Sequence, residues 1–147
     1  LSRHPGYLEG VGYPLVLTPH PGEMARLCSD TIPEIQSDRL GAAQQKARET
    51  GAVVVLKGAA TVIASPDGRC AVNPTGNPGM AKGGSGDVLA GITGALLAQR
   101  VPAFEAGVLG AYLHGQAGDL CAQRYTQRAM LPTDLPHALP EVFRRLL

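Results

Sequence analysis

The sequence predicts a single α/β domain in which helices cover a largely parallel sheet. Strand-like and helical segments alternate through the first half of the chain, and helical segments dominate the second half. The run AVVVLKG, residues 52–58, is rich in β-branched side chains and is typical of a strand buried on both faces. The chain has 147 residues, of which 44% are hydrophobic, and no linker divides it. We therefore treat residues 1–147 as one domain.

The first half of the chain predicts one strand and then three helical segments. The strand, residues 15–18, is short and apolar and ends in a proline-rich turn. Residues 22–28 fit one or two helical turns, and a short helix follows Thr31, whose hydroxyl is suited to cap it. Residues 37–50 fit a longer helix, with Ser37 as its expected cap.

The second half predicts a hairpin followed by three helices. Residues 61–64 and 70–73 read as strands, and the turn sequence SPDG between them favours antiparallel pairing. After a glycine-rich segment, helices are expected at residues 87–100 and from residue 102 or 104 to about residue 125. Thr133 is suited to cap a last helix that contains prolines.

Small residues recur along two of these helices and predict that the helices pack closely. Close approach would offset the cost of glycine inside a helix, which is about 1 kcal/mol relative to alanine. His114 lies on the neighbouring stripe, and we expect a packed side chain there rather than a ligand. The small residues are Ala90, Gly91, Gly94 and Ala98 on the first helix and Ala103, Gly107, Ala111 and Gly115 on the second.

Composition argues against several classes of partner. The net charge is +1, no basic run occurs and aromatic residues make up only 4%, so nothing indicates a nucleic-acid partner. No apolar stretch is long enough to span a bilayer, and we expect no membrane partner. The three cysteines are far apart and form no CxxC pair, which is typical of a protein of the reducing cytoplasm.

The segment PTGNPGMAKGGSGDVLAGITGALLAQ, residues 74–99, predicts an anion site. Glycines allow the backbone to approach a ligand closely, and the start of a helix offers free N–H groups and a partial positive charge. Asp87 lies at the join, where it could cap the helix or accept a proton from a ligand. The segment is not a P-loop, because Lys82 precedes the glycines. It is not GxGxxG either, because Leu89 stands at the third glycine position.

Residues 77–99 resemble the GxGD segment of the ribokinase-like superfamily, and more closely that of the ADP- or ATP-dependent NAD(P)H-hydrate dehydratases. Two further segments are similar to that family and occur in its order: LTPHPGEMARL, residues 17–27, and VVVLKGAATVIASPDG, residues 53–68. The segment LPTDLPHALP near the end of the chain fits as well. The resemblance begins at about residue 15 and implies the ribokinase-like layered α/β/α fold.

The resemblance also implies an activity. Members of the family repair NADH and NADPH whose nicotinamide ring has become hydrated. They phosphorylate the ring hydroxyl and then eliminate phosphate, and they consume ADP or ATP with Mg²⁺. We therefore expect an ADP-dependent (S)-NAD(P)H-hydrate dehydratase, a cytoplasmic hydro-lyase whose partner is its small-molecule substrate. We also expect it to assemble as a homo-oligomer.

Carried onto this chain, the resemblance implies a role for each residue that matches a family motif. Asp87 would be the catalytic base and would contact the substrate, together with His20. Glu23 would act on Mg²⁺ through water. The anion hole would comprise Gly84, Ser85 and Gly86. The nucleotide would be bound by Lys57, Gly58, Ala59, Ala60, Thr61 and Gly86.

The chain departs from the family pattern in two respects. Lys82 stands where the family more often has a small hydroxyl residue, and we expect it either to add charge near the phosphates or to point to solvent. The family domain extends upstream of the residue 17–27 segment, and many members carry an N-terminal epimerase domain. We therefore expect this chain to be the C-terminal portion of a longer protein, with those parts absent.

Three simpler or competing interpretations stay open at this point. Asp87 and Glu23 could be ordinary acidic residues at helix starts, where carboxylates are favoured anyway. A ribokinase-like kinase of vitamin precursors would share the anion hole and the base, but such kinases carry asparagine where this chain has His20. A non-catalytic nucleotide-binding module would keep the glycines without turnover.

Overall fold

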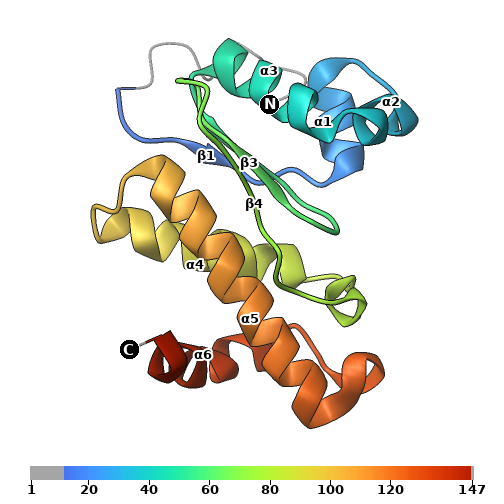
Figure 1. Ribbon diagram of the computed structural model, residues 1–147, viewed down its shortest axis with the longest axis vertical. Helices are drawn as coiled ribbons and strands as arrows, with labels where there is room; N and C mark the ends of the chain where they lie inside the picture. Colours follow the sequence, from blue (N-terminus) through green and yellow to red (C-terminus); the bar gives the residue numbers. More distant parts are fainter. Residues whose placement is uncertain (1–11, 147) are drawn as a thin grey trace.

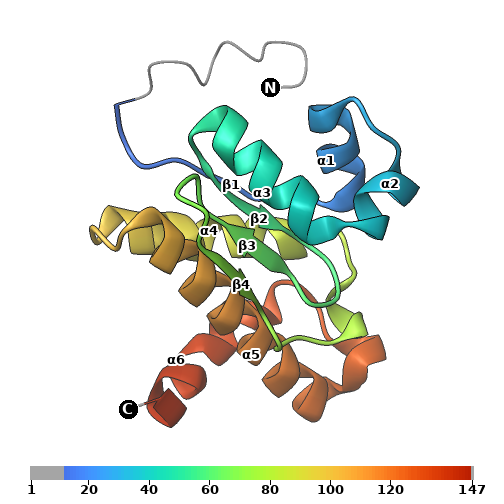
Figure 2. The same ribbon diagram turned by 45° about the horizontal axis from the view of Figure 1, so that its top comes forward.

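The computed structural model describes residues 12–146, which fold into layers of helices on both sides of a sheet. Helices α1, α2 and α3 cover one face, and α4 and α5 cover the other (Figure 1). Helix α6 packs on α5, on the side away from the sheet (Figure 2). The layered α/β fold predicted from the sequence is confirmed.

The sheet is mixed rather than largely parallel in the part of the chain that the structure describes. Its order is β1 (Val16–Leu17), β2 (Val53–Leu56), β3 (Val62–Ala64) and β4 (Cys70–Val72). Strands β1 and β2 are parallel, whereas β2–β3 and β3–β4 are antiparallel. The physical reason is connection length, because a parallel crossover needs about a dozen or more residues. The segments 57–61 and 65–69 are too short for one.

Three capped helices form the layer on the first face: α1 (Pro21–Cys28), α2 (Ile32–Ser37) and α3 (Arg39–Thr50). Thr31 caps α2, as predicted. The predicted cap of α3 is wrong by one residue. The Asp38 carboxylate accepts the Gly41 amide at 2.8 Å, while the Ser37 hydroxyl donates back to the Glu34 carbonyl at 2.7 Å. Side chains from alternate strand positions complete this half of the core, namely Val54, Leu56, Val62 and Ala64.

The second face of the sheet packs against α4 (Ser85–Ala98) and α5 (Ala103–Ala129). A Cβ at Gly107 would lie 3.2 Å from the Val55 side chain, and one at Gly110 would lie 2.5 Å from the Thr93 hydroxyl. The predicted close packing is therefore confirmed on α5. It is wrong for the small face of α4, because a Cβ at Gly91 or Gly94 would meet no described atom within 4 Å.

Helix α5 bends near its C-terminal end, before the chain continues into α6 (Asp134–Leu146). Thr126 adopts φ 69° and ψ 157°, outside the helical region. The chain then turns back and buries Met130 between the two helices. The expected end of this helix near residue 125 coincides with the bend.

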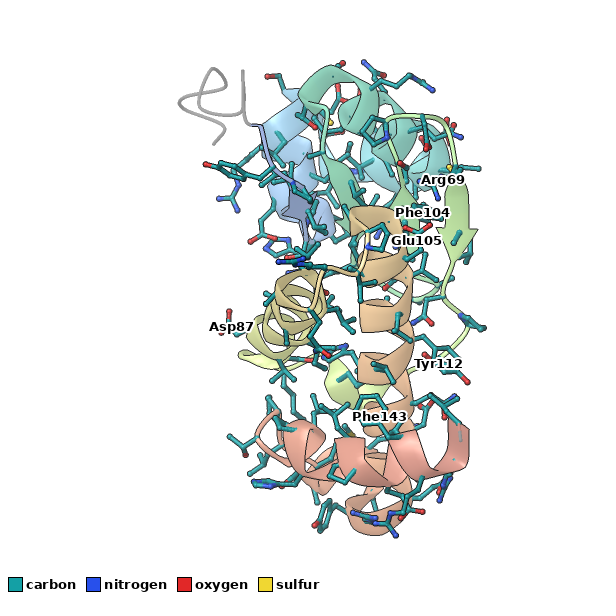
Figure 3. The ribbon with its side chains drawn as sticks, turned by 90° about the vertical axis from the view of Figure 1, so that its left-hand side faces the viewer. Arg69, Asp87, Phe104, Glu105, Tyr112 and Phe143 are labelled. Atoms are coloured by element: carbon teal, nitrogen blue, oxygen red, sulfur yellow. The ribbon has the colours of Figure 1, made fainter. Side chains whose placement is uncertain are left out.

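An exposed ion-pair cluster fastens the β3–β4 hairpin to the start of α5 (Figure 3). The Arg69 guanidinium lies 2.7 Å from the Glu105 carboxylate and 2.9 Å from that of Asp67. It also covers the Phe104 ring at 4.6 Å from the centroid.

Within residues 12–146, none of the helices combines the length and the apolar character needed to cross a membrane.

Candidate functional site

Two loops approach each other where the parallel strands β1 and β2 end. We call residues 57–61 the KGAAT loop and residues 82–87 the KGGSGD loop. The Lys57 amide donates to the Pro19 carbonyl at 2.8 Å, which joins the ends of the two strands. The carboxyl ends of parallel strands are a common place for ligand sites in open α/β sheets. The KGAAT loop, the start of α1 and the first turn of α4 therefore lie together at the carboxyl ends of these strands.

The Lys57 side chain spans the distance between the two loops. Its Nζ lies 3.6 Å from the Glu23 carboxylate at the start of α1. A Cβ added to Gly86 would lie only 2.9 Å from the same Nζ. Gly86 therefore leaves room for an ammonium group beside the N-terminus of α4, and that ammonium adds positive charge to a helix end that already favours anions.

His20 and Glu23 form a reciprocal capping box at the start of α1. The His20 Nδ1 accepts the amides of Gly22 and Glu23 at 3.0 and 3.2 Å. The Glu23 carboxylate accepts the His20 amide at 2.7 Å. Half of the His20 side chain is exposed, at 50%. Its Nδ1 is occupied, and its ring remains available to a ligand from the solvent side.

Glu23 remains ionised because its neighbours outweigh its burial. Burial alone would raise the pKa of this carboxyl, but the His20 amide and the Lys57 charge together hold the pKa below its ordinary value. No group of three His, Cys, Asp or Glu side chains that could hold a metal occurs in the described part of the chain.

Asp87 lies in the first turn of α4 but does not cap it. The helix begins at Ser85, two residues before the expected start, and Gly84 occupies the cap position with φ 95°. The Asp87 side chain is exposed and forms no hydrogen bond or ion pair with any residue in 12–146. Figure 3 shows it projecting outward from α4, on the side away from α5. The carboxylate is free to meet a ligand.

Sequence reasoning missed a contact between Ser85, in the KGGSGD loop, and His114 on α5. Ser85 is buried, and its hydroxyl lies 3.3 Å from the His114 Nε2. Burial lowers the pKa of His114; hydrogen bonding at Ser85 partly opposes this shift, and the charge of Lys57 adds to it. The prediction of a packed histidine is confirmed. The pairing joins residues 29 apart in the sequence, so predicting it would have required knowing that α5 packs against this loop.

Lys82 does not take either of the positions expected from the sequence. Its ammonium donates to the carbonyls of Gln127, Arg128 and Met130 at 3.3, 2.9 and 2.5 Å. These carbonyls lie where α5 bends, so they lack the partners that a continuing helix would provide. Lys82 therefore points neither to the phosphates nor to solvent, and it anchors its loop to the end of α5.

A further network holds the start of the glycine-rich segment on α5. The Asp119 carboxylate accepts the Gly76 amide and the Asn77 side-chain amide, both at 2.9 Å. The Thr75 hydroxyl donates to the Tyr112 carbonyl at 3.1 Å. The segment is thus fixed to a rigid helix along much of its length.

A family model described as NAD(P)H-hydrate dehydratase matches residues 7–141. The chain belongs to the NAD(P)H-hydrate dehydratase family. It is 58% identical over 139 residues to a bifunctional NAD(P)H-hydrate repair enzyme from Moorella thermoacetica. That match covers 95% of this chain and 26% of the Moorella protein.

Solved structures support the same family and the ribokinase-like fold. The ADP/ATP-dependent NAD(P)H-hydrate dehydratase from Bacillus subtilis, co-crystallised with ATP and Mg²⁺, superposes with a TM-score of 0.87 at 40% identity. A ribokinase-like superfamily protein from Enterococcus faecalis superposes with a TM-score of 0.75 at 35% identity. These matches cover 91% and 97% of this chain, and 50% and 49% of the two solved chains. The chain thus spans about half the length of these two solved chains.

Proposed function

We propose that this chain carries the nucleotide- and phosphoryl-binding part of an ADP-dependent (S)-NAD(P)H-hydrate dehydratase. The observation that carries the proposal is the position of Lys57. Its ammonium lies between Glu23 and Gly86, in the first turn of α4. A fixed cation beside a helix N-terminus stabilises the charge of a phosphoryl group in transfer. The names of the Moorella and Bacillus relatives supply the substrate class.

The proposed reaction has two steps. The hydroxyl oxygen of the hydrated nicotinamide ring attacks the terminal phosphorus of ADP or ATP, a new O–P bond forms, and the bond to the bridging oxygen breaks to release AMP or ADP. Asp87 accepts the hydroxyl proton. The carbon–oxygen bond of the phosphorylated ring then breaks, phosphate leaves, and loss of a proton from the adjacent carbon restores the double bond. The products are NAD(P)H, phosphate and the shortened nucleotide.

The chain's own residues suit these roles. The exposed, unpaired carboxylate of Asp87 can meet a hydroxyl from the solvent side. The amides of Gly84 and Gly86 find no acceptor among residues 12–146 and suit an anion hole at the start of α4, whereas the Ser85 amide donates to the Lys82 carbonyl at 3.2 Å. His20 would contact the substrate, and the KGAAT loop would bind the nucleotide. Mg²⁺, where bound, would neutralise phosphate charge, and Glu23 would contact it through water, because one of its oxygens already accepts the His20 amide.

The decisive experiment follows the return of reduced-nicotinamide absorbance from NADPH hydrate. The protein is incubated with Mg²⁺ and ADP, with Mg²⁺ and ATP, and with Mg²⁺ alone. We expect recovery only when a nucleotide is present, with release of one phosphate for each NADPH formed. Recovery without nucleotide, or phosphate release that does not follow NADPH, would contradict the proposed reaction. A protein extended to the length of the Bacillus relative provides the matched comparison.

We also propose that the protein acts in the cytoplasm as a homo-oligomer. Its three cysteines are all free thiols, which suits a reducing compartment. Strands β1 and β4 lie at the two edges of the sheet, and Val72 on β4 is 57% exposed. Sedimentation velocity over a range of concentrations tests the assembly, and a single monomeric species throughout would contradict it.

A further inference from the structure

The Arg39 guanidinium binds the carbonyl side of the KGAAT loop. Arg39 is the first residue of α3, and its NH2 donates to the carbonyls of Leu56 at 3.1 Å and Lys57 at 3.2 Å. Its NH1 donates to the Ala59 carbonyl. The planar group lies so close to the loop that a Cβ at Gly58 would be 2.9 Å from NH2. One side chain from another layer therefore binds three carbonyls, one at the end of β2 and two in this loop.

Three backbone amides of the loop are free of acceptors in the described part of the chain. Gly58 and Ala60 both adopt positive φ, 143° and 54°. The amides of Gly58, Ala59 and Ala60 find no acceptor among residues 12–146. Successive free N–H groups in a turn that mixes right- and left-handed residues form a concave site for anions. The left-handed backbone of Ala60 costs conformational free energy. The contacts of Arg39 with the loop therefore help to keep the loop in this shape.

The charge of Arg39 is not neutralised by a carboxylate in the described part of the chain. No acidic side chain in the described residues forms an ion pair with it. Burial lowers its pKa, yet a guanidinium stays protonated in proteins. Its Nε is buried and meets no hydrogen-bond partner among residues 12–146, which is uncommon. The loop thus carries the ammonium of Lys57, contacts the guanidinium of Arg39 and has free amides. This arrangement suits phosphate groups.

We propose that Arg39 is a positioning residue for the phosphates of a nucleoside diphosphate or triphosphate. By holding the carbonyls of Leu56, Lys57 and Ala59, it fixes the loop in a shape whose free amides, at residues 58–60, bind the phosphates. This inference rests on the proposed function, because it specifies how the nucleotide is recognised. It adds a residue that lies outside the three segments on which the family resemblance depends.

The test measures ADP binding by calorimetry and steady-state kinetics for Arg39→Ala and Arg39→Lys. Loss of three charge-assisted hydrogen bonds should weaken ADP binding by about tenfold or more in Arg39→Ala. The kcat at saturating ADP should change far less, because Asp87 and the α4 N-terminus remain in place. Arg48→Ala is the matched control. Arg48 is an exposed arginine on the same helix, and this variant should bind ADP like the wild type.

Two further readouts separate positioning from general loss of structure. Arg39→Lys keeps the charge but cannot reach three carbonyls with one planar group, so it should fold and still bind ADP more weakly than the wild type. Millimolar guanidinium should restore part of the ADP affinity of Arg39→Ala and leave Arg48→Ala unchanged. Wild-type affinity in Arg39→Ala would overturn the inference alone. Failure of the wild type to bind ADP would overturn the proposed function as well.

Discussion

The KGAAT loop and the KGGSGD loop both begin with a lysine followed by a glycine, but the two lysines contact different parts of the molecule. The Lys57 ammonium lies in the site, between Glu23 and Gly86. The Lys82 ammonium binds carbonyls at the end of α5. The difference lies in the main-chain groups within reach. Lys57 faces the open N-terminus of a helix across from a carboxylate, whereas Lys82 lies beside carbonyls left free where α5 bends. A lysine next to glycines therefore does not by itself indicate an anion site.

The largest expected effect is on turnover in Asp87→Asn, a change in the KGGSGD loop that should leave ADP binding at the KGAAT loop intact. Asp87→Asn removes the proposed base but keeps the size and the exposed position of the side chain. Turnover of NADPH hydrate should fall by about a hundredfold to ten-thousandfold, as is usual for loss of a general base. ADP affinity, measured by calorimetry, should stay close to that of the wild type. Normal turnover in this variant would show that another group accepts the proton.

The next effect comes from Lys57→Met, which removes the cation that spans the two loops. The kcat/KM for ADP should fall by about a hundredfold, because a charge that stabilises the transferring phosphoryl group is lost. The free energy of unfolding should change by only about 0–1 kcal/mol, since the contact with Glu23 is a partly exposed ion pair. Steady-state kinetics and urea unfolding of the same preparation provide both values. A large loss of stability with intact kinetics would reverse the roles that we assign to the two lysines.

Lys82→Met should show the opposite pattern. The variant leaves the carbonyls of Gln127, Arg128 and Met130 without their charged donor. We expect the free energy of unfolding to fall by about 1–2 kcal/mol, with kcat/KM within a few-fold of the wild type. Arg124→Met is the control, because Arg124 is exposed on α5 and binds none of these groups. Equal stability of Lys82→Met and Arg124→Met would mean that the anchoring contacts contribute nothing measurable.

The smallest expected effect is the contribution of His114, which contacts Ser85 of the KGGSGD loop, to the pH dependence of the free energy of unfolding. The pKa of His114 is lowered in the folded chain, chiefly by burial, so the unfolded chain takes up its proton first as the pH falls. This stabilising contribution is present above the unfolded pKa, about 6.5, and is lost as the pH falls toward the folded pKa. His114→Asn should therefore lose less stability than the wild type between about pH 7 and pH 5. Urea unfolding at a series of pH values tests this, and parallel curves for the two proteins would contradict it.

The sequence predicted the local features of this fold well and the contacts between distant segments less well. The strand at 53–56, the cap at Thr31 and the hairpin at 62–72 follow from side-chain pattern and turn chemistry. The sequence also correctly identified a packed histidine at position 114. The direction of Lys82 could not be predicted, because it depends on where a helix 45 residues away bends. The three carbonyls bound by Arg39 depend likewise on the packing of α3 against the end of β2.

The start of α4 was misplaced for a related reason. An acidic residue at 87 reads as a cap, and sequence rules favour placing the helix boundary there. The boundary lies instead at Gly84, whose positive φ allows Ser85 to turn inward and meet His114. A contact from another helix thus shifts the boundary by two residues and leaves Asp87 on the surface of the first turn.

The uneven surroundings of the helical glycines bear on how this protein could be made more heat-resistant. Replacing glycine by alanine inside a helix is a common stabilising change, worth about 1 kcal/mol per site. A Cβ added at Gly91 or Gly94 on α4 would meet no described atom within 4 Å, so both positions are open to that change. Gly110 is not, because an added methyl group would meet the Thr93 hydroxyl at 2.5 Å. The same substitution in two adjacent helices would therefore strengthen one and force the other away from its neighbour.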